Sequence, residues 1–304
     1  MKIKDFIDYE QPNEYIVESD RYNSKYSTPV LTAGQSFILG YTNESKGVYE
    51  KGPCIIFDDF TTSVHYVDFP FKVKSSAMKI LTTKSNADIK YCYYLLLSLS
   101  KMPPNHKRQW ISTTSEKSYV LPSMDKQISI VKQLDLISDT IANYTNQIEN
   151  LDNLVKARFI EMFGDPENNP NGWMESPLSE KLSVLGGFAF KSDKFSEISG
   201  IPILRIGNIN SGHFKPVNMV YWKEDENLER YLIYPGDLVM SLTGTVGKDD
   251  YGNVCILGDD FEKYYLNQRN AKLEIQGGIN KFYLSQLLTF TQVKKKLTGI
   301  SQCH

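Results

Sequence analysis

The sequence predicts an α+β protein in which two similar domains of mixed short strands and helices are joined by one long coiled-coil-type helix. Three observations support this: a heptad pattern of apolar residues near the middle of the chain, flanking segments that repeat one another in order, and short strand-like runs bounded by turns in both copies. The expected boundaries are residues 1–121 for the first domain, 122–164 for the helix and 165–304 for the second domain.

The predicted helix covers residues 123–163, which contain no glycine or proline. Pro122 and Ser123 are a start signal, and Gly164 followed by Pro166 is a stop signal. Apolar residues alternate at steps of four and three, which places one stripe along a helix. The residues of this seam are Ile130, Leu134, Ile137, Ile141, Tyr144, Ile148, Leu151 and Val155. The pattern favours an exposed seam that pairs with a partner helix; the alternative is an amphipathic helix lying on its own domain.

The two flanking segments align in the same order, with offsets that grow through loop insertions. Pro29–Gly34 matches Pro202–Gly207, Cys54–Phe57 matches Leu238–Met240, and Ala77–Ile80 matches Ala271–Leu273. A further match, of Cys54–Phe60 with Cys255–Phe261, breaks this order, and we attribute it to chance. The strands expected from these runs are 29–33, 38–41, 54–57 and 78–81 in the first copy, and 203–206, 237–242, 254–257 and 271–275 in the second. A helix is expected after each set, at 88–100 and 279–297.

Composition narrows the functional classes. The formal net charge of −2 over 304 residues argues against a protein that depends on a bulk basic surface, although basic residues focused on one face remain compatible with DNA binding. The four cysteines form no Cys-x-x-Cys or Cys/His cluster, so no metal site is expected. No signal peptide and no apolar run long enough for a bilayer are present, and reduced thiols in the cytoplasm are the expected state.

Several motifs, taken together and in order, resemble one known family. They are Pro29–Thr42, Ile55–Thr62 and Phe71–Met78 before the helix, Leu121–Gln127 and Phe159–Asp165 at its two ends, and Pro202–Ile209 and Tyr234–Lys248 after it. This order resembles the specificity subunit of a Type I restriction–modification system, in which two target-recognition domains flank a spacer helix. In that family a second spacer helix follows the second domain and packs against the first. This chain stops where that helix would begin, so we expect a second copy or another polypeptide to cover the seam.

The resemblance implies a non-catalytic chain that selects a DNA sequence. Its partners would be double-stranded DNA, modification subunits that carry S-adenosylmethionine, and a restriction subunit that uses ATP and Mg²⁺; no cofactor or metal is expected on this chain itself. A 40-residue helix is about 60 Å long, so we expect a bipartite, asymmetric target whose unread spacer length follows helix length.

Polar residues in the turns between strands are the candidates for DNA contact, because paired donors and acceptors read base edges and hydroxyl groups bind phosphates. The first copy offers Asp58, Asp59, Thr61, Thr62, Lys72, Lys74, Ser75 and Ser76. The second offers Arg205, Asn208, Ser241, Thr243, Gly244, Thr245, Lys248, Asn267, Gln268, Arg269 and Asn270. For each of these, a polar turn satisfied by its own backbone is the alternative.

Catalytic motifs do not fit the spacing. The stretch Gly244–Lys248 lacks the glycine and the hydroxyl residue that a phosphate-binding loop needs at Leu242 and Asp249. Three alternatives to the DNA-reading subunit stay open: a coiled-coil scaffold that binds proteins without DNA, an enzyme that modifies DNA by itself, and a truncated or phase-variable specificity copy that is inactive alone.

Overall fold

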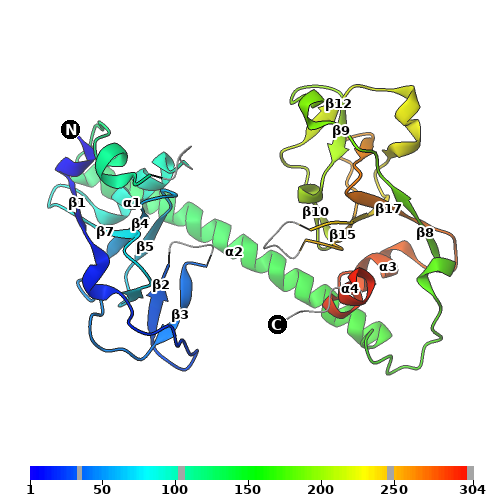
Figure 1. Ribbon diagram of the computed structural model, residues 1–304, viewed down its shortest axis with the longest axis horizontal. Helices are drawn as coiled ribbons and strands as arrows, with labels where there is room; N and C mark the ends of the chain where they lie inside the picture. Colours follow the sequence, from blue (N-terminus) through cyan, green and yellow to red (C-terminus); the bar gives the residue numbers. More distant parts are fainter. Residues whose placement is uncertain (33–35, 102–106, 245–249, 300–304) are drawn as a thin grey trace. The chain divides into compact units, whose positions relative to one another are not determined.

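The computed structural model describes residues 1–32, 36–101, 107–244 and 250–299 (Figure 1). Internal contacts divide the chain into two compact units, Met1–Gln147 (unit 1) and Ile148–His304 (unit 2). Each unit combines short strands with helices, which confirms the predicted α+β class. The division falls inside the long helix, so each unit includes part of it.

Unit 1 contains two sheets. The four-stranded antiparallel sheet has the order β1-β7-β4-β5, from Ile7–Glu10, Met78–Thr83, Cys54–Asp58 and Val64–Val67. The three-stranded sheet has the order β3-β2-β6, from Ile38–Thr42, Thr28–Leu31 and Lys72–Val73, with β2 and β6 parallel. Helix α1 spans Ile89–Leu99, and the short turns η1, η2 and η3 span Ile3–Asp5, Pro12–Tyr15 and Trp110–Thr114.

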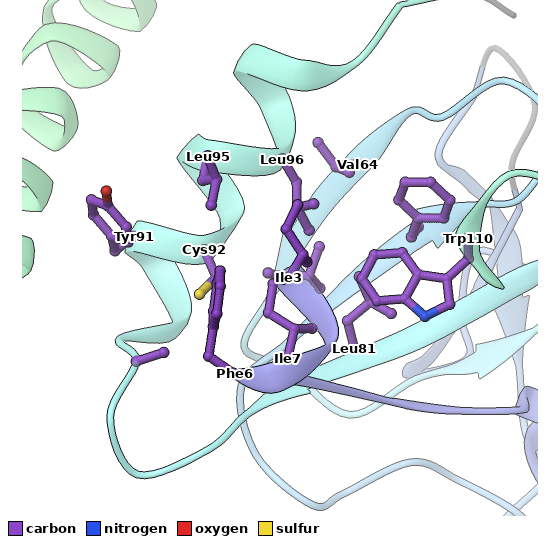
Figure 2. Packing of buried hydrophobic residues seen from close by; sticks show 13 residues of the cluster. Ile3, Phe6, Ile7, Val64, Leu81, Tyr91, Cys92, Leu95, Leu96 and Trp110 are labelled. Carbon is purple, nitrogen blue, oxygen red and sulfur yellow. The ribbon is translucent and has the colours of Figure 1, made fainter. Parts of the chain in front are cut away.

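Strand β4 is apolar from Cys54 to Phe57 because both of its faces are buried. Ile55 and Phe57 pack into a cluster with Cys92 of α1 and Trp110, and Figure 2 shows the side chains of this cluster around Cys92 and Trp110. Ile56 points the other way, into a cluster with residues of the three-stranded sheet. A strand covered on both faces loses the alternation of apolar and polar residues that marks a half-exposed strand.

Unit 2 repeats this plan. One sheet has the order β15-β14-β17-β8, from Val254–Ile256, Leu238–Ser241, Asn270–Ile275 and Leu182–Gly186. The second has the order β12-β9-β16-β13, from Val220–Trp222, Ile201–Leu204, Tyr264–Leu266 and Leu232–Ile233, with β9 and β16 parallel. The hairpin β10-β11 consists of Ile209–Asn210 and His213–Phe214. The helices are α3 (Lys281–Leu287) and α4 (Thr291–Thr298), and the short turns η4 to η7 are Leu178–Glu180, Ser192–Lys194, Ile206–Asn208 and Glu226–Tyr231.

The sheet orders agree with the internal repeat predicted from sequence. Strands β1, β7, β4 and β5 of unit 1 correspond in order to β8, β17, β14 and β15 of unit 2, and the parallel pair β2/β6 corresponds to β9/β16. Cys54 lies on β4, whereas Cys255 lies on β15, which is the counterpart of β5. The out-of-order cysteine match is therefore a coincidence, as predicted.

One expected element is wrong in detail. The sequence predicts a single helix over 279–297, but the structure has two helices with a break at Leu288–Phe290. Phe290 adopts an extended conformation, and its side chain packs against Phe159 of the long helix with ring centroids 5.2 Å apart. Packing of this ring therefore interrupts a segment whose apolar spacing alone favours one helix.

Helix α2, Met124–Phe163, is continuous over 40 residues, in agreement with the predicted 123–163. Its start is fixed by the buried Gln127, whose amide group donates to the carbonyl oxygens of Asn86 (3.1 Å) and Pro122 (2.8 Å). The helix ends at Phe163, and the φ of +84° at the following Gly164 suits glycine. Trp173 Nε1 donates to the last carbonyl oxygen, that of Phe163 (2.7 Å). Among the helices of the described residues, none has the length and apolar character to cross a membrane.

Candidate nucleic-acid interface

In each unit, the turns that hold the candidate DNA-contacting residues meet at one edge. Parallel strands β9 and β16 end together, and the turn after β16 leads into β17, beside the end of β14. Hydrogen bonds join these turns: the Asn270 amide donates to Leu204 O (2.7 Å), and Leu242 N donates to Arg269 O (2.8 Å). In unit 1, Lys74 N donates to Leu31 O (2.8 Å) and Asp59 N to Ala77 O (3.2 Å). We call these the turn edges of units 1 and 2.

At the turn edge of unit 1, Asp59 lies inside the protein rather than toward a base. Its side chain is 1% exposed and pairs with the fully buried Lys79 (3.1 Å). Its carboxylate also accepts hydrogen bonds from the backbone N–H groups of Gln109 (3.0 Å) and Trp110 (2.8 Å). Three interactions therefore satisfy this buried charge, and a structural role replaces the DNA contact predicted for Asp59.

The neighbouring residues of the same turn are also held internally. Asp58 is buried, and its Oδ1 accepts from the backbone N–H groups of Phe60 (2.7 Å) and Thr61 (3.1 Å), so it closes the turn. Thr62 is buried with a φ of +60°, and its hydroxyl donates to Lys101 O (3.0 Å). Thr61 is half-buried and donates to Ser63 Oγ (3.1 Å). Among the predicted contact residues of this turn, only Thr61 keeps some access to solvent.

The second turn of unit 1 carries its remaining basic candidates. Lys72 is buried, pairs with Glu44 (2.9 Å) and donates to Lys46 O (2.6 Å), so it is a structural residue too. Lys74 is half-exposed and pairs with Asp20, and the hydrogen bond from Lys74 to Asp20 raises its pKa. Ser75 is exposed and Ser76 half-buried. Lys74, Ser75 and Ser76 therefore stay candidates for DNA contact, but the charge of Lys74 is already partly compensated.

In unit 2, the buried candidates are amides and a hydroxyl that brace the turns. Asn208 Oδ1 accepts from Arg205 N (2.9 Å), while its amide donates to Lys215 O (3.0 Å) and Val217 O (2.9 Å). Ser241 donates to Asp250 O (2.5 Å) and accepts from Asn253 N (3.0 Å). Asn267 Oδ1 accepts from Arg269 N (3.2 Å), and Asn270 is fully buried. Burial of Asn208, Ser241, Asn267 and Asn270 assigns all four to the scaffold of the turns.

The accessible candidates of unit 2 are different in chemistry from those of unit 1. Gln268, Arg269, Thr243 and Gly244 are exposed, and Arg205 is half-exposed. Arg205 and Arg269 line one polar hollow of about 280 Å³. Neither guanidinium has a carboxylate partner within the described residues. Thr245 and Lys248, the last two candidates, lie outside the described residues.

Sequence reasoning missed two residues that shape these edges. Lys79 was not singled out, because a lysine inside a strand gives no signal that its partner is Asp59. Asn218 lines the hollow and has a φ of +51°, a conformation that asparagine tolerates better than most residues. The turn composition of Pro216 to Asn218 is a usable signal for Asn218.

The seam of α2 has two different environments. Ile130 packs against the core of unit 1, and Leu134 lines a hollow with Tyr91 of α1. From Ile137 onward the seam is open, with exposed fractions of 62% at Ile141 and 60% at Leu151. The exposed seam comprises Ile137, Ile141, Tyr144, Ile148, Leu151 and Val155. Large apolar side chains exposed in succession mark a surface for another macromolecule.

Other chemistry has little support in the described residues. There, no group of three His, Cys, Asp or Glu side chains is placed to hold a metal ion. Burial raises the pKa of the Cys54, Cys92 and Cys255 thiols to about 12, so these thiols are protonated and unreactive at neutral pH.

Comparison with known proteins identifies relatives of the chain, although no family model matches it. Over 153 residues it is 46% identical to the Type I restriction enzyme EcoR124I/EcoR124II specificity subunit of Escherichia coli, a match that covers 46% of this chain and 38% of that protein. Over 118 residues it is 31% identical to the EcoBI specificity subunit of Escherichia coli, covering 36% of this chain and 22% of that protein. Each match thus spans well under half of the curated relative.

A solved structure extends the likeness in fold. The Type I restriction–modification S subunit from M. genitalium superposes with a TM-score of 0.56 at 15% identity, over 98% of this chain and 79% of that one. At this identity the match supports the fold alone, and it does so over nearly the whole chain. The family resemblance seen in the sequence motifs is confirmed: this chain is a relative of the specificity subunits of Type I restriction enzymes.

Proposed function

We propose that this chain is a non-catalytic DNA-recognition subunit, which directs methylation and restriction subunits to a bipartite, asymmetric duplex target. One observation supports the proposal: both units have a turn edge of the same topology, but the accessible side chains on the two edges differ. Unit 1 offers Lys74, Ser75 and Ser76, whereas unit 2 offers Arg205, Gln268 and Arg269. The same scaffold with unlike readers suits a target whose two halves differ.

The reaction chemistry belongs, in this proposal, to partner subunits. The modification subunits would supply S-adenosylmethionine and transfer the methyl group, and the restriction subunit would use ATP and Mg²⁺. The exposed seam of α2 supports such an assembly, because its apolar side chains need a covering surface. We propose the modification subunits as the principal partner of this seam, with a second copy of the chain as the alternative.

Selection of bound duplexes from a random pool tests DNA recognition directly, with the chain alone and with its modification subunits. We expect enrichment of two short, different motifs separated by a fixed number of unselected base pairs. Retention should weaken as salt rises, since cationic side chains displace counterions from the phosphates. Recovery of a random pool in both conditions would contradict the proposal.

A protein-interaction scaffold is the second candidate, and the exposed seam is the observation that favours it. A scaffold would bind its partner through Ile141 and Leu151 but show no salt-dependent retention of DNA. Sedimentation of the isolated chain at several concentrations distinguishes the two possible partners of the seam. A dimer whose population rises with concentration indicates a second copy of the chain, whereas a monomer at all concentrations favours a different polypeptide.

The spacer role of α2 has its own test. Inserting four residues into the exposed middle of the helix, after Thr145, adds about one helical turn or roughly 6 Å, close to two base pairs. We expect the unselected spacer of the DNA target to lengthen while both motifs stay the same. An unchanged spacer would show that helix length does not set the distance.

A further inference from the structure

The turn edge of unit 2 contains a hollow that joins two arginines. Residues 205–208, which follow β9, form one side of it, Val217 and Asn218 form another, and Arg269, in the turn after β16, completes the lining. Among the described residues, no carboxylate lines it. Within the described residues, neither Arg205 nor Arg269 forms an ion pair. The hollow therefore offers an uncompensated positive surface in a chain whose formal net charge is −2.

One of the two arginines is fixed by its neighbours. Asn208 accepts from Arg205 N (2.9 Å), which holds the backbone of the turn, and Arg205 Nη2 donates to the carbonyl oxygen of Asn218. Asn208 also donates to Val217 O (2.9 Å), so both sides of the hollow are joined through one buried amide. The Arg205 guanidinium is thus pre-organised, but part of its donor set is already used.

The other arginine has a backbone held by hydrogen bonds and an exposed side chain. Arg269 N donates to Asn267 Oδ1 (3.2 Å), and Arg269 O accepts from Leu242 N (2.8 Å), so the turn beneath it is held on both sides. Arg269 is exposed, and among the described residues its guanidinium forms no hydrogen bond, so its paired N–H donors stay available. An arginine on a rigid turn with both donors available is suited to a planar acceptor pair.

We propose that Arg269 reads a guanine in the half-site bound by unit 2, with the hollow placing Arg205 against a neighbouring phosphate. Guanine presents the O6 and N7 acceptors side by side in the major groove, and the two parallel donors of Arg269 match them. Arg205, which has lost part of its fork to Asn218, retains charge and single donors, and those serve a phosphate. This inference rests on the proposed DNA-recognition function and names one base within it.

The test compares the wild type with Arg269→Ala, and uses Arg230→Ala as a matched control, because Arg230 is an exposed arginine of the same unit outside the hollow. Duplex selection with the wild type should show a guanine at one position of one motif. In Arg269→Ala that position should lose its preference, by roughly 5- to 150-fold in relative affinity, while the other positions stay selected. Arg230→Ala should keep the full motif.

Replacement of the identified guanine by 7-deazaguanine, which lacks the N7 acceptor, completes a double-mutant cycle between Arg269 and that base. The analogue should weaken binding by the wild type and leave Arg269→Ala unaffected. Equal weakening of all sequences by Arg269→Ala, with the guanine preference kept, would overturn the inference in favour of a phosphate contact. A wild type that selects no sequence, alone or with modification subunits, would instead reject the proposed function. An unchanged unfolding temperature checks that the variant is folded, as expected for an exposed side chain.

Discussion

The turn edges of the two units have the same topology but differ in the residues that hold them together. Ion pairs do so in unit 1, and neutral amides do so in unit 2. In unit 1, the buried pair Lys79–Asp59 and the pair of buried Lys72 with half-buried Glu44 brace the edge from inside. In unit 2, buried amides of Asn208 and Asn270 do the bracing, and arginines remain accessible at the surface. Strand order therefore fixes where the turns meet. Whether charged or neutral side chains hold the turns together decides which charged side chains stay accessible to a ligand.

The largest effect is expected from removing the buried brace of unit 1. Asp59→Ala leaves Lys79 charged, fully buried and without its carboxylate, so we expect a loss of about 3–5 kcal/mol in the free energy of unfolding of unit 1. Denaturant unfolding measures it, followed by the fluorescence of Trp110 in a background in which Trp173 and Trp222 of unit 2 are replaced by Phe. The exposed Asp259→Ala in unit 2 is the control and should change stability by about 0.5 kcal/mol or less. Equal effects of both variants would contradict the structural role of Asp59.

The part of the exposed seam that lies in unit 1 sharpens the comparison, because it offers apolar side chains where the turn edges offer polar ones. Ile141→Asp should weaken binding of a modification subunit by about tenfold or more, since a charge would enter an apolar interface. The stability of the isolated chain should change little, because Ile141 is 62% exposed. Titration calorimetry gives the affinity, with the exposed polar Asn143→Asp as control. Undiminished binding by Ile141→Asp would remove the seam from the proposed interface.

A smaller effect is expected on the salt dependence of DNA affinity when a basic residue of either turn edge is removed. Arg205→Ala should reduce the slope of log affinity against log salt by about 0.9, the value of one phosphate contact. Lys74→Ala should reduce it by less, because Lys74 already pairs with Asp20. Fluorescence anisotropy with one duplex at several salt concentrations measures both slopes. A larger change for Lys74→Ala than for Arg205→Ala would reverse the ranking of the two edges.

The smallest effect concerns the contact of α1 with α2 in unit 1. Lys90 pairs with Asp135 (2.8 Å), and this hydrogen bond lowers the pKa of Asp135 and raises that of Lys90. A lowered carboxyl pKa stabilises the folded state above the ordinary value of 3.8, and this stability is lost as pH falls through the folded pKa. A raised lysine pKa adds stability below 10.5 that is lost as pH rises through its folded pKa.

Asp135→Asn should therefore cost under about 1 kcal/mol at neutral pH, because both side chains are about a third exposed. The difference from wild type should shrink as the pH falls below 3.8. Denaturant unfolding at pH 7 and at pH 3 measures it. A loss that is the same at both values would show that the ion pair is not its cause.

Much of the fold could be predicted because it depends on local periodicity. The apolar steps of four and three define α2, and the run Cys54 to Phe57 identifies the central strand of unit 1. The sequence pattern did not predict short strands such as β1 and β16, nor the break near Phe290 between helices α3 and α4. These features depend on partners distant in sequence, such as the packing of Phe290 on Phe159.

The candidate site was predictable only as a set of turns. Polar composition located the segments around Asp58 and Asn267 but could not separate the buried side chains from the exposed ones. Asp59 and Arg269 both look like surface residues in the sequence, yet one is held by Lys79 and the other has no such partner among the described residues. That distinction comes from tertiary contacts, which no local pattern encodes.

In the proposed function, two unlike units of one chain select a two-part DNA sequence, and partner subunits perform the reaction there. Mapping methylated bases genome-wide in cells that express modification subunits, with and without this chain, tests it most directly. We predict a new methylated motif with two different halves and an unread spacer, present only when the chain is expressed. An identical methylation map in both cells would contradict it.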